Sequence, residues 1–397
     1  MKRKTWLLLA LTLLAVLALS CAQAQEAEEL TSQCTFSAAY RSKLFRLTDG
    51  KLNMPFEVPA KYDMWVEGQL PEDSPAYGMY LTWTSEPTPS KLEVWNGTDF
   101  EPYATCGDRG MSHEYVTLPG TCRFRLSPLE GTVMNITEVR LLSQGELPAW
   151  VQNWQPSPEK ADLLLLVAHP DDEYIFFGGL IPYYAVERQL HVSVCYLTFS
   201  CERRLHELLD GLWTAGLREY PTVLSFKDRF TRTLDKGFAL WGRDNVLDAV
   251  ANVIDTLQPE VVVAHDLQGE YGHGAHRVAG ATMLALIRDH ERELTWQPKK
   301  LYLHLWEEGE LMMDWETPSE ALGGRTPLEA AQEAFKCHKS QQGFSCTMKN
   351  GVKYMFQVVP HDMFDNAKFG LAYSTVGEDE AHNDLMEHIS TQTQGGL

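Results

Sequence analysis

The sequence predicts two domains: a β-sandwich of jelly-roll type, then an α/β domain with a Rossmann-like, largely parallel sheet. Three observations predict this order. Short runs of alternating apolar and polar residues occupy residues 34–142, continuous apolar runs alternate with helical stretches from residue 161, and a proline-rich segment separates them. With 397 residues, 44% of them hydrophobic, the chain is long enough to form two cores.

Residues 1–24 have the three parts of an export signal: a basic start, an apolar run from Trp6 to Leu19, and small residues ending at Ala24. We therefore expect a signal peptide and an exported protein, either secreted or at the cell surface. Residues 17–21 also resemble a bacterial lipoprotein signal, with Cys21 as the lipidated residue. The apolar run is shorter than the roughly 20 residues that a membrane-spanning helix needs.

The net charge of -20 and the lack of a basic run argue against binding to nucleic acid or to anionic lipid. Any membrane contact is therefore expected only through a lipid at Cys21. Among the eight cysteines, Cys106 with Cys122 and Cys337 with Cys346 could form local disulfides, although other connectivities stay open. The sequence contains no Cys-x-x-Cys pair, so a zinc site made of cysteines has no support.

Residues 25–147 are expected to form the β-sandwich. Apolar and polar residues alternate around Met79 to Trp83, and turn signals such as Asn96-Gly97 separate the runs. The end of this region, residues 135–141, resembles jelly-roll carbohydrate-binding domains. Three tryptophans, Trp65, Trp83 and Trp95, could stack on sugar rings, but tryptophans at strand spacing are more often core residues.

A linker is expected over residues 148–160, followed by the α/β domain over residues 161–375 and a frayed acidic tail over 376–397. A capping box at Thr326 predicts a helix from Pro327 to about Gln341, and 3.6-residue spacing predicts another around residues 246–257. The strand-like runs of the domain are Leu163 to Ala168, Val192 to Phe199, Thr222 to Phe226, Val261 to Ala264 and Leu301 to Leu305.

Chemistry-bearing residues follow two of these runs. The first run is followed by His169-Pro170-Asp171-Asp172-Glu173, and the fourth by a segment from His265 that includes His273 and His276. Because the carboxyl ends of parallel strands open onto one edge of a sheet, both segments are expected to reach one pocket.

Histidine and carboxylate together are typical ligands of a catalytic zinc, which takes three protein ligands and keeps one position open. His169, Asp172 and His276 supply such a set, with His265 as an alternative ligand. In the structural alternative, Asp171 and Asp172 cap the following helix and the histidines are polar loop residues. Two motifs at matching strand ends favour the metal site.

These motifs resemble the LmbE-like or PIG-L family of zinc-dependent N-acetylglucosaminyl deacetylases. Residues 168–173 match the family's Ala-His-Pro-Asp-Asp-Glu in full, whereas residues 272–276 keep both histidines of Gly-His-Pro-Asp-His but carry Gly274 and Ala275 between them. The resemblance covers about residues 161–341. It implies an LmbE-like fold, with roles for eight residues: zinc ligands His169, Asp172 and His276, base Asp171, oxyanion stabiliser His273, and pocket residues Arg204, Asp228 and Tyr271.

The resemblance therefore implies an exported, zinc-dependent hydrolase that removes acetyl from an N-acetylated amino sugar or glycan. Asp171 would take a proton from water and return it to the leaving amine, while His273, if protonated, would meet the developing oxyanion. Two alternatives remain at this point: a glycan-binding surface protein that has lost catalysis, and a zinc amidase acting on a non-sugar amide.

Overall fold

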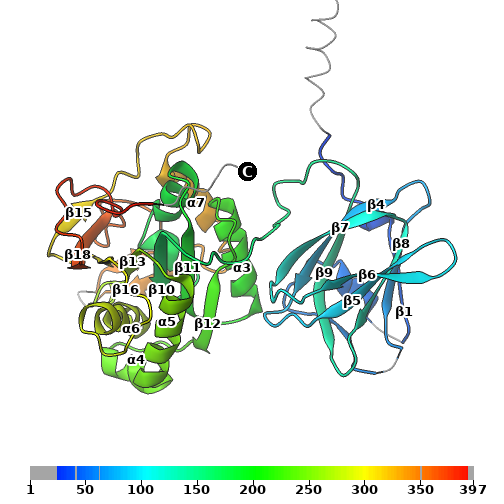
Figure 1. Ribbon diagram of the computed structural model, residues 1–397, viewed down its shortest axis with the longest axis horizontal. Coiled ribbons are helices and arrows are strands. Elements are labelled where there is room, and N and C mark those ends of the chain that lie inside the picture. Colours follow the sequence, from blue (N-terminus) through cyan, green and yellow to red (C-terminus); the bar gives the residue numbers. More distant parts are fainter. Residues whose placement is uncertain (1–24, 41–42, 62, 349–350, 392–397) are drawn as a thin grey trace, which may run out of the picture. The chain divides into compact units, whose positions relative to one another are not determined.

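The computed structural model describes residues 25–40, 43–61, 63–348 and 351–391. The expected signal peptide and Cys21 lie outside these residues. The chain divides into two compact units, residues 1–152 and 153–397, and the division falls inside the segment expected to be a linker (Figure 1). Within the described residues, no helix has both the length and the apolar character needed to cross a membrane.

The N-terminal unit consists of two antiparallel sheets (Figure 1). Alternate residues of β4, such as Met79, Leu81 and Trp83, are fully buried in a core that both sheets share. One sheet has the order β2-β9-β4-β7 and the other β1-β3-β8-β5-β6. The bounds are β1 Thr35–Ala38, β2 Phe56–Val58, β3 Val66–Gln69, β4 Ala76–Trp83, β5 Ser90–Trp95, β6 Phe100–Cys106, β7 His113–Thr121, β8 Arg123–Pro128 and β9 Met134–Leu142, with short helices η1 Thr31–Gln33 and η2 Leu44–Leu47.

The three tryptophans of this unit have different surroundings. Trp83 is a core residue, and its indole donates a hydrogen bond of 3.0 Å to Glu114. Trp65 and Trp95 are partly buried, and the guanidinium carbons of Arg125 and Arg123 lie 4.4 and 4.5 Å from their ring centroids. Arginines therefore lie over the rings that the sequence offered as sugar platforms.

The expectation of local disulfides is wrong for the described residues. All seven described cysteines are free, including Cys106, Cys122, Cys337 and Cys346. Cys106 is fully buried at the end of β6, and Cys337 lies 3.5 Å from the hydroxyl of Thr214.

The C-terminal unit is built on a seven-stranded sheet with the order β12-β11-β10-β13-β14-β18-β15. The first five strands pair in parallel, whereas β18 pairs antiparallel with both β14 and β15. All five residues of β10 are buried, because helices cover both faces of the sheet. The bounds are β10 Leu163–Val167, β11 Val192–Phe199, β12 Thr222–Lys227, β13 Val261–Ala264, β14 Lys300–His304, β15 Glu310–Met312 and β18 Lys368–Ser374.

The helices of this unit follow the strands, as in βαβ units. They are α2 Asp172–Ile175, α3 Glu202–Thr214, α4 Leu234–Trp241, α5 Arg243–Leu257, α6 Gly274–Met283 and α7 Pro327–Phe335, with wider-turned η3 Pro182–Glu187 and η4 Leu284–Arg288. The apolar faces of α5 and α6 pack with alternate strand residues, such as Leu164 and Leu166, in one core. A separate hairpin, β16 (Ser345–Thr347) with β17 (Lys353–Met355), was not expected.

Two expectations about the C-terminal part of the chain are wrong: the end of helix α7 and the frayed tail. Helix α7 begins at Pro327 with the predicted capping box but ends at Phe335, not near Gln341, because turns at residues 336–338 carry His338 into the core. The expected frayed tail is docked over its described part. Asp379 and Leu385 are buried, and Asp384 accepts hydrogen bonds from Tyr184 and Arg188.

Candidate active site

Two neighbouring strand ends bring the motif residues together. Strands β10 and β13 pair in parallel with Leu166 opposite Ala264, so the segments that begin at His169 and His265 leave the sheet side by side. A pocket of about 450 Å³ opens there. Its lining includes seven of the eight residues expected in the site: His169, Asp171, Asp172, Arg204, Asp228, Tyr271 and His273.

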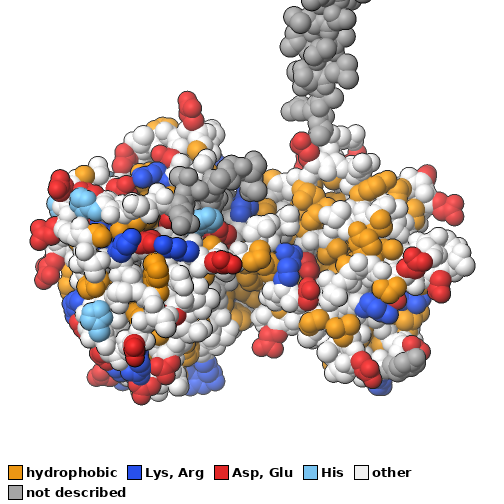
Figure 2. Space-filling model, viewed as in Figure 1, with side chains coloured by type: hydrophobic (Ala, Val, Ile, Leu, Met, Phe, Trp, Pro, Cys, Tyr) orange, Lys and Arg blue, Asp and Glu red, His pale blue; other side chains and the backbone are white. Residues whose placement is uncertain are grey.

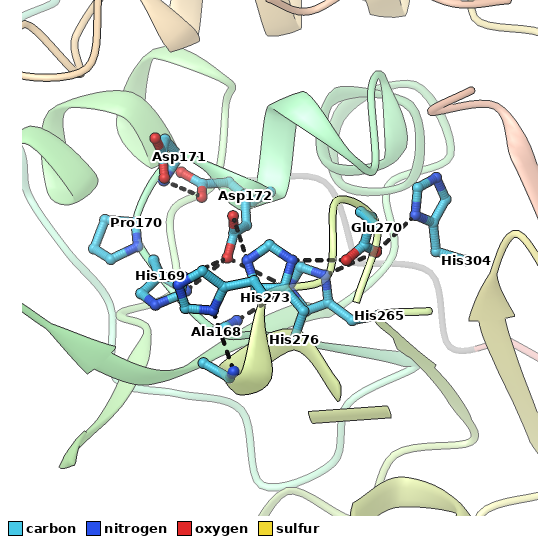
Figure 3. Close-up of polar contacts among 12 residues, drawn as sticks. Ala168, His169, Pro170, Asp171, Asp172, His265, Glu270, His273, His276 and His304 are labelled. Carbon is cyan, nitrogen blue, oxygen red and sulfur yellow. Dashed lines mark hydrogen bonds and ion pairs between the residues drawn. The ribbon is translucent and has the colours of Figure 1, made fainter. Parts of the chain in front are cut away.

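The Asp172 carboxylate lies between two histidines (Figure 3). Its Oδ2 is 3.2 Å from Nδ1 of His169, and its Oδ1 is 3.4 Å from Nε2 of His276. Burial alone would raise the pKa of Asp172, but His276 and His169 outweigh that effect and hold it well below its usual range. The three residues expected as metal ligands therefore meet at an ionised carboxylate.

Two overlapping groups of residues could hold a metal ion. One consists of His169, His273 and His276, and the other of Asp172, His265 and His276. Within each group, the potential ligand atoms all lie within 4.8 Å of one another. His276 belongs to both groups. Its Nε2 is buried and has no hydrogen-bond partner among the described residues, whereas its Nδ1 bonds to Glu270 at 2.7 Å. A buried nitrogen lone pair beside an ionised carboxylate fits the role of a metal ligand.

His265, the alternative ligand, is already engaged at both ring nitrogens. Its Nδ1 bonds to Glu270 at 3.1 Å, and its Nε2 accepts the backbone N–H of Ala168 at 3.1 Å. The ring is fully buried at the end of β13. These contacts make His265 a structural support that ties one strand end to the other.

Asp171 does not cap the helix that it precedes. Its side chain makes no capping hydrogen bond, and its backbone φ of 105° is a conformation that non-glycine residues seldom adopt. Glu173 accepts the Asp171 N–H at 2.8 Å, and Arg204 donates to the Asp171 carboxylate at 3.0 Å. Burial raises the pKa of Asp171 to about 7, although Arg204 lowers it. Such local strain typically accompanies a functional residue.

His273 stands at the start of α6, where its Nδ1 accepts the N–H of Ala275 at 3.2 Å. Burial lowers the pKa of His273, and the nearby rings of His169 and His276 lower it further. The ring is therefore neutral and carries its hydrogen on Nε2. The expected oxyanion donor is thus a neutral imidazole.

Gly274, where the resembled motif has proline, is required by the local packing. Its N–H donates to the carbonyl of Thr231 at 2.7 Å, and a Cβ at this position would collide with the Thr231 side chain. Proline has neither the hydrogen nor the space. The altered motif is therefore fitted to the loop that precedes α4.

The three expected pocket residues have different roles. Arg204 lies at the pocket, but its guanidinium bonds to the Pro170 carbonyl and to Asp171, so it acts on the base. Asp228 lies 3.7 Å from Nε2 of His169 and is partly exposed. Tyr271 packs at 6.2 Å, ring to ring, on Phe176.

Sequence reasoning missed two groups of residues. Aromatic side chains at the pocket, Phe230, Phe344 and Phe356, come from a loop and from the ends of the β16–β17 hairpin, which carry no motif. Glu270 and His304 lie beside the expected metal ligand His276, where Glu270 bonds to His276 at 2.7 Å and to His304 at 2.9 Å. A signal for His304 was present, because it lies at the end of an apolar strand, β14, that pairs in parallel with β13.

The segment that carries the site is similar in sequence to known proteins. Residues 164–287 match the family model of GlcNAc-PI de-N-acetylase. A 1D-myo-inositol 2-acetamido-2-deoxy-alpha-D-glucopyranoside deacetylase of Mycolicibacterium vanbaalenii is 31% identical over 176 residues, which are 36% of this chain and 59% of that protein. The chain spans 59% to 60% of the length of the first three such relatives.

Two solved structures are similar to separate parts of the chain. N,N'-diacetylchitobiose deacetylase from Pyrococcus horikoshii has 18% identity and a TM-score of 0.35, over 48% of this chain and 74% of that one. A family 32 carbohydrate-binding module from C. perfringens has 13% identity and a TM-score of 0.25, over 30% of this chain and 99% of that one. The two motifs and the match over residues 164–287 together make this segment a domain of the PIG-L (LmbE-like) family of N-acetylglucosaminyl deacetylases.

Proposed function

We propose that this chain is an exported zinc-dependent hydrolase that removes acetyl from an N-acetylated amino sugar and releases acetate and an amine. The observation that carries the proposal is the Asp171 carboxylate, which makes no capping hydrogen bond and lines the same pocket as His169 and Asp172. A carboxylate with a pKa of about 7 is suited to accept and return a proton near neutral pH.

The donor set favours zinc over a hard cation. Two imidazoles and one carboxylate are typical of catalytic zinc sites, whereas magnesium and calcium sites are made mainly of oxygen ligands. His169, Asp172 and His276 would hold the ion, and the unpartnered Nε2 of His276 supports this assignment. When bound, zinc supplies Lewis acidity that polarises an amide carbonyl and makes a water molecule more acidic.

Asp171, His273 and Arg204 each have a separate part in the proton transfers and hydrogen bonds of the reaction. Asp171 accepts a proton from the attacking water and passes it to the leaving nitrogen, so that the amine departs neutral. His273 donates its Nε2 hydrogen to the oxygen of the tetrahedral species, and one such donor contributes about 2.7 to 4 kcal/mol in other enzymes. Arg204 keeps Asp171 ionised near neutral pH and fixes its direction.

The pocket supports a small or terminal sugar unit as the substrate. Its volume of about 450 Å³ lies in the range of small-molecule sites. Aromatic rings can stack on a sugar face, and Asp228 can accept hydrogen bonds from hydroxyl groups. The named relative acts on an acetamido sugar that is linked to inositol, which supports the same class of substrate.

The test is acetate release from a panel of substrates by chelator-treated protein before and after zinc is restored. The panel contains N-acetylglucosamine, its inositol-linked and chitobiose forms, an N-acetylated polymer and N-acetyl amino acids. Zinc-dependent release from the sugars supports the proposal. Release from the amino acids alone would favour the amidase alternative, and bound glycan without release would favour a binding protein.

Export, with either cleavage near Ala24 or a lipid at Cys21, and a jelly-roll arrangement of the N-terminal sheets are part of the same proposal. They are supported by the sequence of residues 1–24 and by the two antiparallel sheets. N-terminal sequencing and mass measurement of the protein from the producing cell distinguish cleavage near Ala24 from a lipidated Cys21. A chain that retains residues 1–24 in the cytoplasm would contradict export.

A further inference from the structure

Glu270 lies between the two histidine-bearing ends of the β13–α6 connection, and no role follows from its position in the motif. Its side chain is fully buried, and its backbone φ is 52°, in the left-handed region. Neither feature suits an ordinary loop glutamate, because burial of a carboxylate is costly unless hydrogen bonds compensate.

Three histidines from three elements converge on this carboxylate (Figure 3). Its Oε1 is 3.1 Å from Nδ1 of His265, 2.9 Å from Nδ1 of His304 and 3.1 Å from the N–H of Asp266. Its Oε2 is 2.7 Å from Nδ1 of His276. The side chain is therefore fixed at one oxygen by supporting residues and presents the other oxygen to an expected metal ligand.

This contact determines where His276 carries its hydrogen. A carboxylate accepts hydrogen bonds and does not donate them, so Nδ1 of His276 must hold the hydrogen. Nε2 then keeps its lone pair, and that nitrogen lies 3.4 Å from Asp172 with no hydrogen-bond partner among the described residues. In free histidine the hydrogen can occupy either nitrogen, and the hydrogen bond to one of them selects the tautomer.

We propose that Glu270 is the positioning residue of the metal centre, and that it holds His276 as the Nδ1–H tautomer with Nε2 directed at the ion. The inference rests on the metal site of the proposed function. A role for Glu270 in orienting His276 also accounts for the change from aspartate in the resembled motif to Ala275. Ala275 is buried and offers only its N–H, which it donates to His273.

The substitution Glu270→Gln tests the tautomer directly. The glutamine carbonyl is expected to occupy the Oε1 side, where three donors converge, so its NH₂ group faces Nδ1 of His276. The histidine must then accept at Nδ1 and carry its hydrogen on Nε2, which removes the ligand lone pair. Zinc affinity, measured by competition with a chromophoric chelator, is expected to fall roughly 10- to 100-fold.

Glu173→Gln is the matched control. Glu173 is also a fully buried carboxylate beside the site, but its histidine partner is His338, at 2.9 Å, which is not an expected ligand. Both substitutions replace a buried, hydrogen-bonded carboxyl group by an amide, so both are expected to lower thermal stability, whereas zinc affinity is expected to fall only in Glu270→Gln. Equal zinc affinity in folded Glu270→Gln and wild-type protein would overturn the proposal.

A second measurement reads the tautomer in wild-type protein and needs a variant only to assign the signal. Nitrogen-15 NMR of the histidine rings in metal-free wild-type protein reports the tautomer of each ring, and loss of a signal in His276→Gln assigns His276. The proposal expects hydrogen on Nδ1, and hydrogen on Nε2 would overturn it. Neither measurement uses a substrate, so a protein that releases no acetate would refute the proposed reaction while leaving the role of Glu270 to be decided by metal affinity and tautomer.

Discussion

The guanidinium of Arg204 donates a hydrogen bond of 3.0 Å to the Asp171 carboxylate, and each of the two side chains is 11% exposed. The pair joins α3 to the end of β10, so it connects the second strand-helix unit to the first motif. Burial raises the pKa of Asp171, and the arginine opposes this rise. The relationship sets the pH at which Asp171 becomes a base.

Replacing Arg204 by glutamine is therefore expected to move the acid limb of activity to higher pH. Asp171 must be ionised to accept a proton, so activity falls as the pH drops through its pKa of about 7. Without the cation that pKa rises further, by about 1 to 3 units for a neighbouring arginine. The pH dependence of kcat/KM measures the shift. Arg229→Gln, at an exposed residue of the same pocket, should leave the limb in place.

Phe344, at the start of the β16–β17 hairpin, is expected to contribute to substrate binding. It is 58% exposed and lines the pocket, so its ring can contact a bound ligand. Phe344→Ala should raise KM about 2- to 12-fold, from an aromatic contact worth about 0.5–1.5 kcal/mol, with kcat little changed. Steady-state kinetics on the preferred substrate measure this. An unchanged KM, as expected for the control Phe45→Ala in the N-terminal unit, would refute the role.

Gly274 is expected to tolerate no side chain while Thr231 is present. A Cβ at residue 274 would meet the Thr231 side chain and, at 3.0 Å, the carbonyl of Thr233. Gly274→Ala should lower the free energy of unfolding by about 1–3 kcal/mol, as overpacking does. Urea denaturation of Gly274→Ala, Thr231→Ala and the double variant gives the coupling. If the collision is the cause, the double variant loses less free energy of unfolding than the two single variants lose together. A loss equal to the sum of the two would exclude the collision as the cause.

The docked C-terminal segment is expected to be essential for stability, because Asp379 pairs with Lys300 and accepts a hydrogen bond of 2.6 Å from Tyr302. The side chains of Lys300 and Asp379 are 0% and 1% exposed. Asp379→Leu leaves a buried, unpaired lysine and should cost about 3–5 kcal/mol in urea denaturation.

Adding Lys300→Met should restore most of that loss, because no buried charge then remains unpaired. The exposed control Glu378→Ala should change stability by less than about 0.5 kcal/mol. Wild-type stability in Asp379→Leu would show that the segment is not held by this pair.

The sheet could be predicted from the sequence where its strands are buried on both faces. The runs at β10, β11 and β13 are continuous and apolar, and the observed strands differ from the expected runs by at most one residue. Strands β15 and β18 were missed because they lie at the antiparallel edge, and β15 is three residues long with alternating burial. The docking of Asp379 was missed because its partner, Lys300, belongs to a distant strand and an acidic segment resembles a solvated one.

The part of the candidate site that could be predicted follows from one rule: the carboxyl ends of parallel strands lie at the same edge of a sheet. That rule brought Asp172 and His276 together without any other knowledge of the fold. It could not identify Glu270, because a glutamate in a loop has many roles and its three histidine partners are recognisable only in space. Nor could it place the aromatic side chains, since stacking residues carry no fixed spacing.

The central claim is that Asp171 is the proton carrier of a metal-dependent deacetylation, and acetate release by Asp171→Asn at matched zinc content tests it most directly. The amide cannot accept a proton, while His169, Asp172 and His276 remain to hold the ion. We predict a full complement of zinc and a rate of acetate release lower by about 10²- to 10⁴-fold, with wild-type activity in the exposed control Asp235→Asn. Undiminished acetate release by zinc-loaded Asp171→Asn would contradict the account.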